Sequence, residues 1–280
     1  MSEQSPQTEA RFHKIGGVHL QLAHPDEVPL RWVGQEEVIK QLLAAWSIIH
    51  EGDVPMHPRL IGKPGVGKTT MAYAAAKRLG QDVYVFQATM DTRPEDLLIT
   101  PVVSEAGQIR YVASPLVTAM LTGGICILDE GNRMSEKSWA SLAPLLDNRR
   151  YIESIVSGLK VHSHPDFRFV ATMNDDASTF EIPEYIHSRL QPQIFLDFPS
   201  RNDELAILEE NLPFVDVEIL EYVVDFLQRA HDADERYTVR DGVNIARYAA
   251  KVLEIEEAPF QEVLQLSTIQ VLGEEAEPYL

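Results

Sequence analysis

An eight-residue run starting at Gly62 has the residue types and the spacing of a phosphate-binding loop. It satisfies the pattern G-x-x-x-x-G-K-[ST], with a short apolar segment before it and a helix-compatible run after it. Glycines let backbone N–H groups converge on phosphate oxygens, and the start of a helix adds the positive end of its dipole. We expect Lys68 to reach the β- and γ-phosphates and the Thr69 hydroxyl to ligate Mg²⁺. The residues expected to bind the phosphates are Gly62, Pro64, Gly65, Val66, Gly67, Lys68, Thr69 and Thr70.

A second element of the same chemistry is an apolar run that ends in two acids. Residues 125–128 read Ile-Cys-Ile-Leu and are followed by Asp129 and Glu130. We expect Asp129 to hold Mg²⁺ through its water shell, and Glu130 to orient and deprotonate an attacking water. A carboxylate beside the metal favours hydrolysis of a nucleotide by water over transfer to a substrate hydroxyl.

The elements that must position these residues alternate between strand and helix patterns. Such alternation predicts an α/β sandwich with a mainly parallel sheet. The apolar runs are 60–61, 83–86, 125–128, 167–171 and 194–198, and the helical patterns between them are 35–50, 68–79, 115–122 and 135–146.

The pattern becomes purely helical after Pro199, over 201–211, 216–231, 239–254 and 259–272. Nineteen acidic and six basic residues fall in 201–280, so this segment carries most of the net charge of −19. Such acidity argues against a broad nucleic-acid or anionic-membrane surface, although it leaves room for a local basic channel. The shift in composition predicts three regions: an N-terminal tail and lead-in (1–28), an α/β nucleotide-binding core (29–200) and an acidic helical domain (201–280).

The cysteine content and the N-terminal residues indicate the cellular compartment of the protein. Its 280 residues include one cysteine, Cys126, inside an apolar run, so we expect an inert buried thiol and no disulfide within the chain. Residues 1–14 are polar without periodicity and predict a loose tail. A signal peptide and an 18-residue apolar stretch are both missing from the sequence, which indicates a cytoplasmic protein.

With these motifs in order, the chain resembles the AAA+ ATPases, and specifically their MoxR-like group, from about Trp32 to about Val252. Residues 32–35 (Trp-Val-Gly-Gln) look like the V-G-Q segment near the adenine, which implies binding by Val33 and Gly34. Residues 169–174 look like the sensor 1 strand, whose Asn174 would hydrogen-bond the γ-phosphate or the attacking water. The run Asp129-Glu130-Gly131-Asn132-Arg133 resembles the D-E-x-N-R of MoxR-like proteins.

Two hairpin-like patterns are similar to insertions of the MoxR-like and Mcm-like members. The first joins 98–103 to 108–112 around Glu105-Ala106-Gly107, like the helix 2 insert. The second joins 150–156 to 159–162 around Ser157-Gly158, like the hairpin before sensor 1. The resemblance implies that such hairpins face the pore of a ring and touch what is remodelled.

The resemblance also implies two functional arginines. Arg189, in His187-Ser188-Arg189-Leu190, takes the place of the arginine finger that completes a neighbour's site in trans. The family pattern has Asp before this arginine and Phe after it, so Arg149 and Arg150 stay rival candidates. Arg240, at the start of a predicted helix, looks like sensor 2 and would report the nucleotide state to the helical domain.

Taken together, the resemblance implies a chaperone-like ATP hydrolase that acts with Mg²⁺ as a hexameric ring and remodels a partner protein. The resemblance implies that proteins with a von Willebrand factor A domain are among such partners. Two alternatives stay open. One is a DNA-directed motor of the Mcm or restriction-enzyme kind, in which the same hairpins serve. The other is a nucleotide-gated binding module with little turnover, against which the pairing of Glu130 with Asn174 speaks.

Overall fold

The computed structural model describes residues 11–28, 32–104, 107–175, 181–255 and 257–280. Contacts divide the chain into two compact units. The first unit comprises Met1–Pro29, Ile39–Ile61 and Met71–Ile194. The second comprises Leu30–Val38, Gly62–Thr70 and Phe195–Leu280, so the phosphate loop groups with the C-terminal helices rather than with the strand before it.

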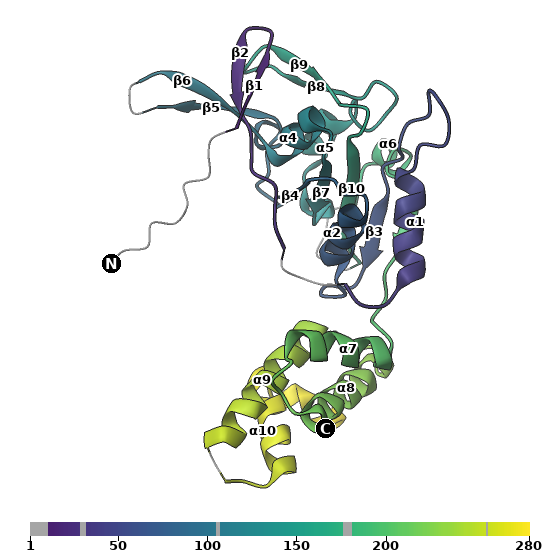
Figure 1. Cartoon of the computed structure of the whole chain (residues 1–280), viewed down its shortest axis with the longest axis vertical. Helices are drawn as coiled ribbons and strands as arrows, with labels where there is room; N and C mark the ends of the chain where they lie inside the picture. Colours follow the sequence, from purple (N-terminus) through teal and green to yellow (C-terminus); the bar gives the residue numbers. More distant parts are fainter. Residues whose placement is uncertain (1–10, 29–31, 105–106, 176–180, 256) are drawn as a thin grey trace. The chain divides into compact units, whose positions relative to one another are not determined.

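The first unit is built on a five-stranded sheet with the strand order β11-β3-β10-β7-β4 (Figure 1). The pairs β4–β7 and β7–β10 are parallel. All seven residues of β10 are buried, as are the first four of β7, which is typical of strands covered on both faces. The α/β sandwich with a parallel sheet is therefore confirmed. The strands are β3 (Arg59–Gly62), β4 (Val83–Gln87), β7 (Ile125–Asp129), β10 (Arg168–Asn174) and β11 (Gln193–Phe195).

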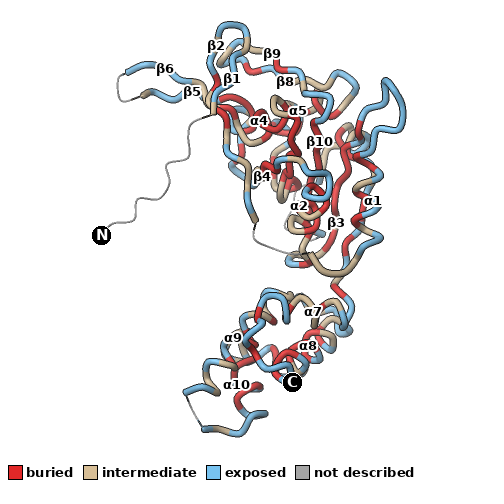
Figure 2. The backbone as a smooth tube through the Cα atoms, in the orientation of Figure 1, coloured by how far each residue is buried: buried red, intermediate tan, exposed pale blue. Residues whose placement is uncertain are grey.

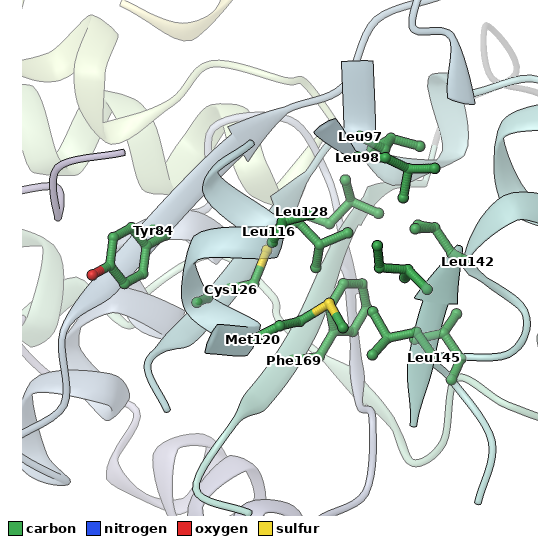
Figure 3. Close-up of a cluster of buried hydrophobic side chains, with 14 of the residues drawn as sticks. Tyr84, Leu97, Leu98, Leu116, Met120, Cys126, Leu128, Leu142, Leu145 and Phe169 are labelled. Atoms are coloured by element: carbon green, nitrogen blue, oxygen red, sulfur yellow. The ribbon is translucent and has the colours of Figure 1, made fainter. Parts of the chain in front are cut away.

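Helices pack on this sheet and close its core. The indole of Trp46, at the end of α1, donates a hydrogen bond of 3.0 Å to the backbone oxygen of Phe169 in β10. Helix α4 packs on β4 and β7, and its side chains meet those of α5 and the strands in the cluster of Figure 3. The helices and turns that lie wholly or mostly in this unit are α1 (Glu36–Trp46), α2 (Lys68–Arg78), α3 (Pro94–Leu97), α4 (Pro115–Thr122), η1 (Gly131–Arg133), α5 (Glu136–Leu142) and α6 (Glu184–His187).

Cys126 lies in this cluster on β7 and is fully buried. Burial, together with the charge of Asp26, raises the pKa of its thiol, so the thiolate is disfavoured. The expectation of a buried thiol is confirmed. Helix α5 ends at Leu142, earlier than the pattern to 146 predicts, because Pro144 has no N–H for the next helical hydrogen bond.

Both expected hairpins are present. Strands β5 (Ile99–Val103) and β6 (Ile109–Ala113) pair antiparallel, and so do β8 (Tyr151–Ser154) and β9 (Leu159–His162). Glu105 and Ala106, at the expected first turn, lie outside the described residues. The β5–β6 hairpin forms one side of a second sheet with the order β1-β2-β6-β5. In Figure 1 the tip of this hairpin extends away from β1 and β2.

The N-terminal segment differs from the expected loose tail. Residues 1–10 lie outside the described residues, but β1 (Phe12–Ile15) pairs antiparallel with β2 (Val18–Gln21). Strand β2 in turn pairs in parallel with β6, with Leu20 opposite Tyr111. The stabilising partner is about ninety residues away, so local composition carries no sign of it.

The second unit contains the four helices predicted after Pro199, and their bounds agree with the prediction within one or two residues. In α8, Leu220, Val223, Val224 and Leu227 repeat at helical spacing and are buried, and they pack with Ile245 of α9 and Leu264 of α10. Figure 2 shows this buried side of the helices in red. The helices are α7 (Arg201–Asn211), α8 (Val217–Asp232), α9 (Val239–Ile255) and α10 (Phe260–Leu272), followed by η2 (Glu274–Tyr279).

Among the described residues, none of the helices combines the length and the apolar character that crossing a membrane requires.

One carboxyl group is buried inside the helical unit. Glu204 of α7 has no exposed surface, and burial raises its pKa to about 7. One of its oxygens accepts a hydrogen bond of 2.8 Å from Gln228. The other, Oε1, lies 3.9 Å from Nδ1 of His231. Because Nε2 of His231 lies 2.7 Å from the Tyr237 backbone oxygen, Nε2 carries the hydrogen and Nδ1 of the neutral ring can accept one.

This geometry predicts that Glu204→Gln stabilises the protein at alkaline pH. A carboxyl whose folded pKa exceeds its unfolded value contributes stability at low pH, and that contribution is lost as pH rises from about 4.5 to about 7. We expect the variant to exceed the wild type in free energy of unfolding by on the order of 3 kcal/mol at pH 8 and to match it near pH 4.5. Urea unfolding at both pH values measures this. His231 titrates in both proteins, so a difference that is constant with pH would contradict the assignment.

Candidate functional site

The phosphate loop joins β3 to α2 and carries its lysine in a fixed position. The side chain of Lys68 is buried, and its ammonium donates hydrogen bonds of 2.8 Å to the backbone oxygens of both Gly62 and Lys63. The loop therefore holds a positive charge against its own backbone, at the N-terminus of α2. The dipole of that helix favours an anion at the same end.

Two glycines of the loop are required by its backbone and its neighbours. Gly65 and Gly67 have φ of +81° and +91°, in the left-handed region that favours glycine. A Cβ at Gly65 would lie 2.2 Å from the methyl carbon of Thr238, and one at Gly67 would lie 3.0 Å from the Trp32 ring. The loop therefore packs against the segment before α1 and the segment before α9, which belong to the same unit.

These two segments carry other candidate residues. Thr238 begins α9 with a capping box, because its N–H and its hydroxyl donate to Asp241 while the Asp241 N–H donates to the Thr238 oxygen. Arg240 lies exposed in the first turn of that helix. On the other side Gly34 has a φ of +78°, and its oxygen accepts a hydrogen bond of 2.6 Å from the Trp32 indole. Val33 and Gly34 thus directly follow Trp32, which contacts the loop, and Arg240 lies two residues after Thr238, which also contacts it.

The two acids lie in the first unit, at the end of β7. Strand register places Gln87 of β4 opposite Asp129, and Ala171 of β10 opposite Leu128. Thr172 therefore follows beside Asp129, and its buried hydroxyl donates a hydrogen bond of 2.5 Å to the Asp129 carboxylate. The Thr172 hydroxyl oxygen also accepts a hydrogen bond of 3.0 Å from the backbone N–H of Glu130. A single hydroxyl thus organises both acids.

Glu130 is held in an uncommon conformation. Its φ of +54° lies in the left-handed region, which costs roughly 1–2 kcal/mol for a residue with a Cβ. Three side chains contact its carboxylate: Arg133 in an ion pair of 2.8 Å, Gln87 at 3.1 Å and Asn174 at 3.3 Å. Strained residues of this kind cluster at functional sites, where the surrounding structure holds them.

Asn174, predicted to act with Glu130, is positioned by Asn132. The Asn132 amide donates a hydrogen bond of 2.8 Å to the Asn174 backbone oxygen and its side-chain oxygen accepts one of 3.3 Å from the Asn174 N–H. Both residues are buried. The structure therefore brings Asp129, Glu130 and Asn174 together, and the Asn and Arg of the D-E-x-N-R run support them.

The contacts of the three candidate arginines are with residues outside the cluster of Asp129, Glu130 and Asn174. Arg189 follows α6, donates to the Tyr185 oxygen, and lies 3.6 Å from the carboxylate of Asp147. Arg149 binds the same carboxylate at 2.8 Å. Arg150 donates instead to Ser163 and to two backbone oxygens of the 164–167 segment.

Sequence reasoning missed Thr172, Gln87 and Asp147. Thr172 could have been found, because it lies two residues before Asn174 and a strand presents alternate residues on one face. Gln87 and Asp147 depend on the order of strands in the sheet and on a contact between distant loops. Neither leaves a signal in the local sequence.

Mg²⁺ fits the oxygen donors that the sequence predicts for it. The Thr69 hydroxyl and the Asp129 carboxylate are hard ligands of the kind this ion prefers. Within the described part of the chain, His, Cys, Asp and Glu form no group of three or more that could hold a metal ion. Mg²⁺ commonly takes one or two protein ligands and keeps water and phosphate oxygens for the rest, which is what the two predicted ligands would require.

The fold and these motifs are those of a P-loop protein of the AAA+ class. The AAA domain of the dynein-related subfamily matches residues 59–190. The structure of a RuvB mutant from Thermotoga maritima superposes with a TM-score of 0.60 over 88% of this chain and 72% of that one, at 20% identity.

Relatives in sequence narrow the class. YeaC of Bacillus subtilis is 28% identical over 79% of this chain and 66% of its own. MoxR of Paracoccus denitrificans is 27% identical over 63% and 50%. The mouse von Willebrand factor A domain-containing protein 8 is 29% identical over 70% of this chain and 11% of its own, so the chain spans only part of these relatives. Over these stretches the chain is similar to MoxR and to other proteins with an AAA domain.

The Thr172 hydroxyl provides a test of the acid cluster. Thr172→Val keeps the shape of the side chain but removes both hydrogen bonds, leaving the Glu130 N–H and the Asp129 carboxylate without this partner. We expect the variant to lose about 1–3 kcal/mol in free energy of unfolding. Thr172→Ser, which keeps the hydroxyl, should lose less. Chemical denaturation of the three proteins measures this, and a valine variant as stable as the serine variant would contradict the bridging role.

Proposed function

We propose that this protein hydrolyses ATP in a ring of identical subunits, hexameric as the family resemblance implies, and uses the energy to rearrange a partner protein. The observation that carries the proposal is the cluster in which Thr172, Asn174 and Arg133 contact two adjacent, half-buried acids.

Each residue has a role in the proposed reaction. Lys68 and the loop N–H groups would bind the phosphates, while Thr69 and Asp129 would hold Mg²⁺, an ion that neutralises charge on a transferring phosphoryl group. Glu130 accepts a proton from the attacking water, and Asn174 orients that water. An arginine from a neighbouring subunit, Arg189 in the family pattern, stabilises the transition state, so turnover depends on assembly. Arg240 reports the nucleotide state to the acidic helical domain, and Val33 and Gly34 contact the adenine.

The hairpins β5–β6 and β8–β9 are our candidates for contact with the partner at the pore. Large apolar side chains are exposed there: Val103 is 70% exposed, Ile109 63% and Ile155 96%. A protein with a von Willebrand factor A domain is the partner class we propose. The mouse relative carries such a domain in its name, together with a region similar to this chain.

Hydrolysis is tested with two variants. Lys68→Ala removes the ammonium that reaches the phosphates, so both binding and turnover should be lost. Glu130→Gln keeps the size of the side chain but cannot accept the proton, so a fluorescent ATP analogue should bind while turnover falls about 100-fold or more. Release of phosphate at several protein concentrations measures both.

Wild-type protein that shows no Mg-dependent hydrolysis at any concentration would contradict the enzyme assignment. A turnover that rises with added DNA and weakens with salt would instead favour a DNA-directed motor.

The partner class is tested by capture on the Glu130→Gln variant with ATP, which should keep the assembled ring on its partner. We expect enrichment of a protein with a von Willebrand factor A domain, and its loss when Lys68→Ala replaces the trapping variant. Enrichment of nucleic acid in its place would overturn the assignment of a protein partner.

A further inference from the structure

The carboxylate of Asp147 joins two arginines that are forty residues apart in the sequence. Asp147 follows α5 and precedes Arg149 in the same loop, whereas Arg189 follows α6. The Arg149 guanidinium binds both carboxylate oxygens, with Nε at 3.0 Å from one and Nη2 at 2.8 Å from the other. Nη2 of Arg189 lies 3.6 Å from the same carboxylate. Asp147 is thus the common contact of the two guanidinium groups.

Further contacts keep Arg189 in place. Its Nη1 donates a hydrogen bond of 2.5 Å to the Tyr185 backbone oxygen, and its guanidinium carbon lies 5.9 Å from the centre of the Tyr185 ring. Nε of Arg189 is buried. The side chain is 27% exposed, compared with 53% for Arg149. Arg189 is therefore the more enclosed member of the pair and Arg149 the more accessible one.

Arg150 belongs to a different set of contacts. Its guanidinium donates to the Ser163 hydroxyl and to the backbone oxygens of His164 and Phe167. Burial lowers its pKa, and the residue has a φ of +49°. These contacts tie the 147–150 loop to the segment before β10, so Arg150 supports the loop rather than presenting a charge.

The pair lies at an open pocket of about 570 Å³, lined by three segments: 54–57, 146–150 and 188–191. The hydrogen bonds from Arg149 lower the pKa of Asp147 to about 2, so the carboxylate stays ionised at neutral pH. His57 in the pocket wall has its pKa lowered to about 4 by burial and stays neutral. One carboxylate therefore balances only one of the two guanidinium groups of the pair.

We propose that Asp147 is a positioning residue that fixes Arg149 and Arg189 as one cationic pair, and that this pair, not Arg189 alone, meets the nucleotide of a neighbouring copy. The inference rests on the proposed ATP hydrolysis in an assembly.

The charge of Asp147 is the first thing to test. Asp147→Asn keeps the size of the side chain but frees both arginines from a common anion. At protein concentrations where the wild type is assembled, we expect turnover at saturating ATP to fall about 10-fold, with the KM for ATP changed less than about 2-fold. Asp147→Glu should restore at least half of the wild-type turnover. Asp166→Asn, which removes an exposed carboxylate near His164, is the matched control and should behave as the wild type.

A double-mutant cycle tests the pair without relying on Asp147. If Arg149 and Arg189 act as a unit, Arg149→Gln and Arg189→Gln each lower turnover about 10-fold or more, and the double variant is no more than about 3-fold worse than the poorer single variant. Losses that multiply would overturn the inference, because independent groups contribute additively to the activation free energy. If Asp147→Asn fails to fold, the cycle still tests whether Arg149 and Arg189 act as one unit.

Assembly gives a readout that does not depend on turnover. Sedimentation velocity with a non-hydrolysable ATP analogue should show that Asp147→Asn needs about 5-fold more protein for half-assembly, with no change when the nucleotide is omitted. A shift of equal size with and without nucleotide would overturn the role toward the neighbour's nucleotide. A wild type that assembles but does not hydrolyse ATP contradicts the proposed function. A wild type that hydrolyses ATP while Asp147→Asn matches it in turnover and assembly contradicts this inference alone.

Discussion

The parallel register of β4, β7 and β10 is the constraint on which the acid cluster depends. Because carboxyl ends of parallel strands meet at one edge of a sheet, Gln87, Asp129 and Thr172 are brought side by side by backbone pairing alone. A slip of one residue would turn Thr172 to the other face and remove the hydroxyl from Asp129. The buried residues of β7 and β10 oppose such a slip, since it would exchange the side chains that pack against the two covered faces of the sheet.

Burial decides which polar contacts in this protein contribute to its stability. Thr172 and Asn132 are buried, so their hydrogen bonds form where water does not compete and an unmade bond is costly. The exposed ion pair of Lys63 with Asp234 is of the opposite kind, because screening by water leaves such pairs with little net energy. The same contrast separates Glu204, whose carboxyl is held away from water, from the many acids that solvate the surface of the helical unit.

How far the site was predictable differs from one residue to another. Lys68, Thr69, Asp129 and Glu130 lie in short contiguous motifs, and contiguous motifs can be recognised without knowing the fold. Asn174 and Arg240 needed the order of the motifs along the chain and the family resemblance. Asp147 could not be recognised at all, because its role depends on contacts with two arginines, one of which lies 42 residues away in the sequence. The strand at Phe12 was missed for the same reason, since its sheet is completed by β6.

The sequence by itself determined the periodic and contiguous features. These are the helices after Pro199, the apolar strands, the phosphate loop and the acids at the end of β7, because their signals lie within a few neighbouring residues. Only the tertiary structure decided which distant side chains meet. It placed one hydroxyl between the two acids, left Glu130 in a left-handed conformation held by three partners, and set one carboxylate between two arginines. The physical reason is that hydrogen bonds and ion pairs act over a few ångströms in space, whatever the separation of their partners along the chain.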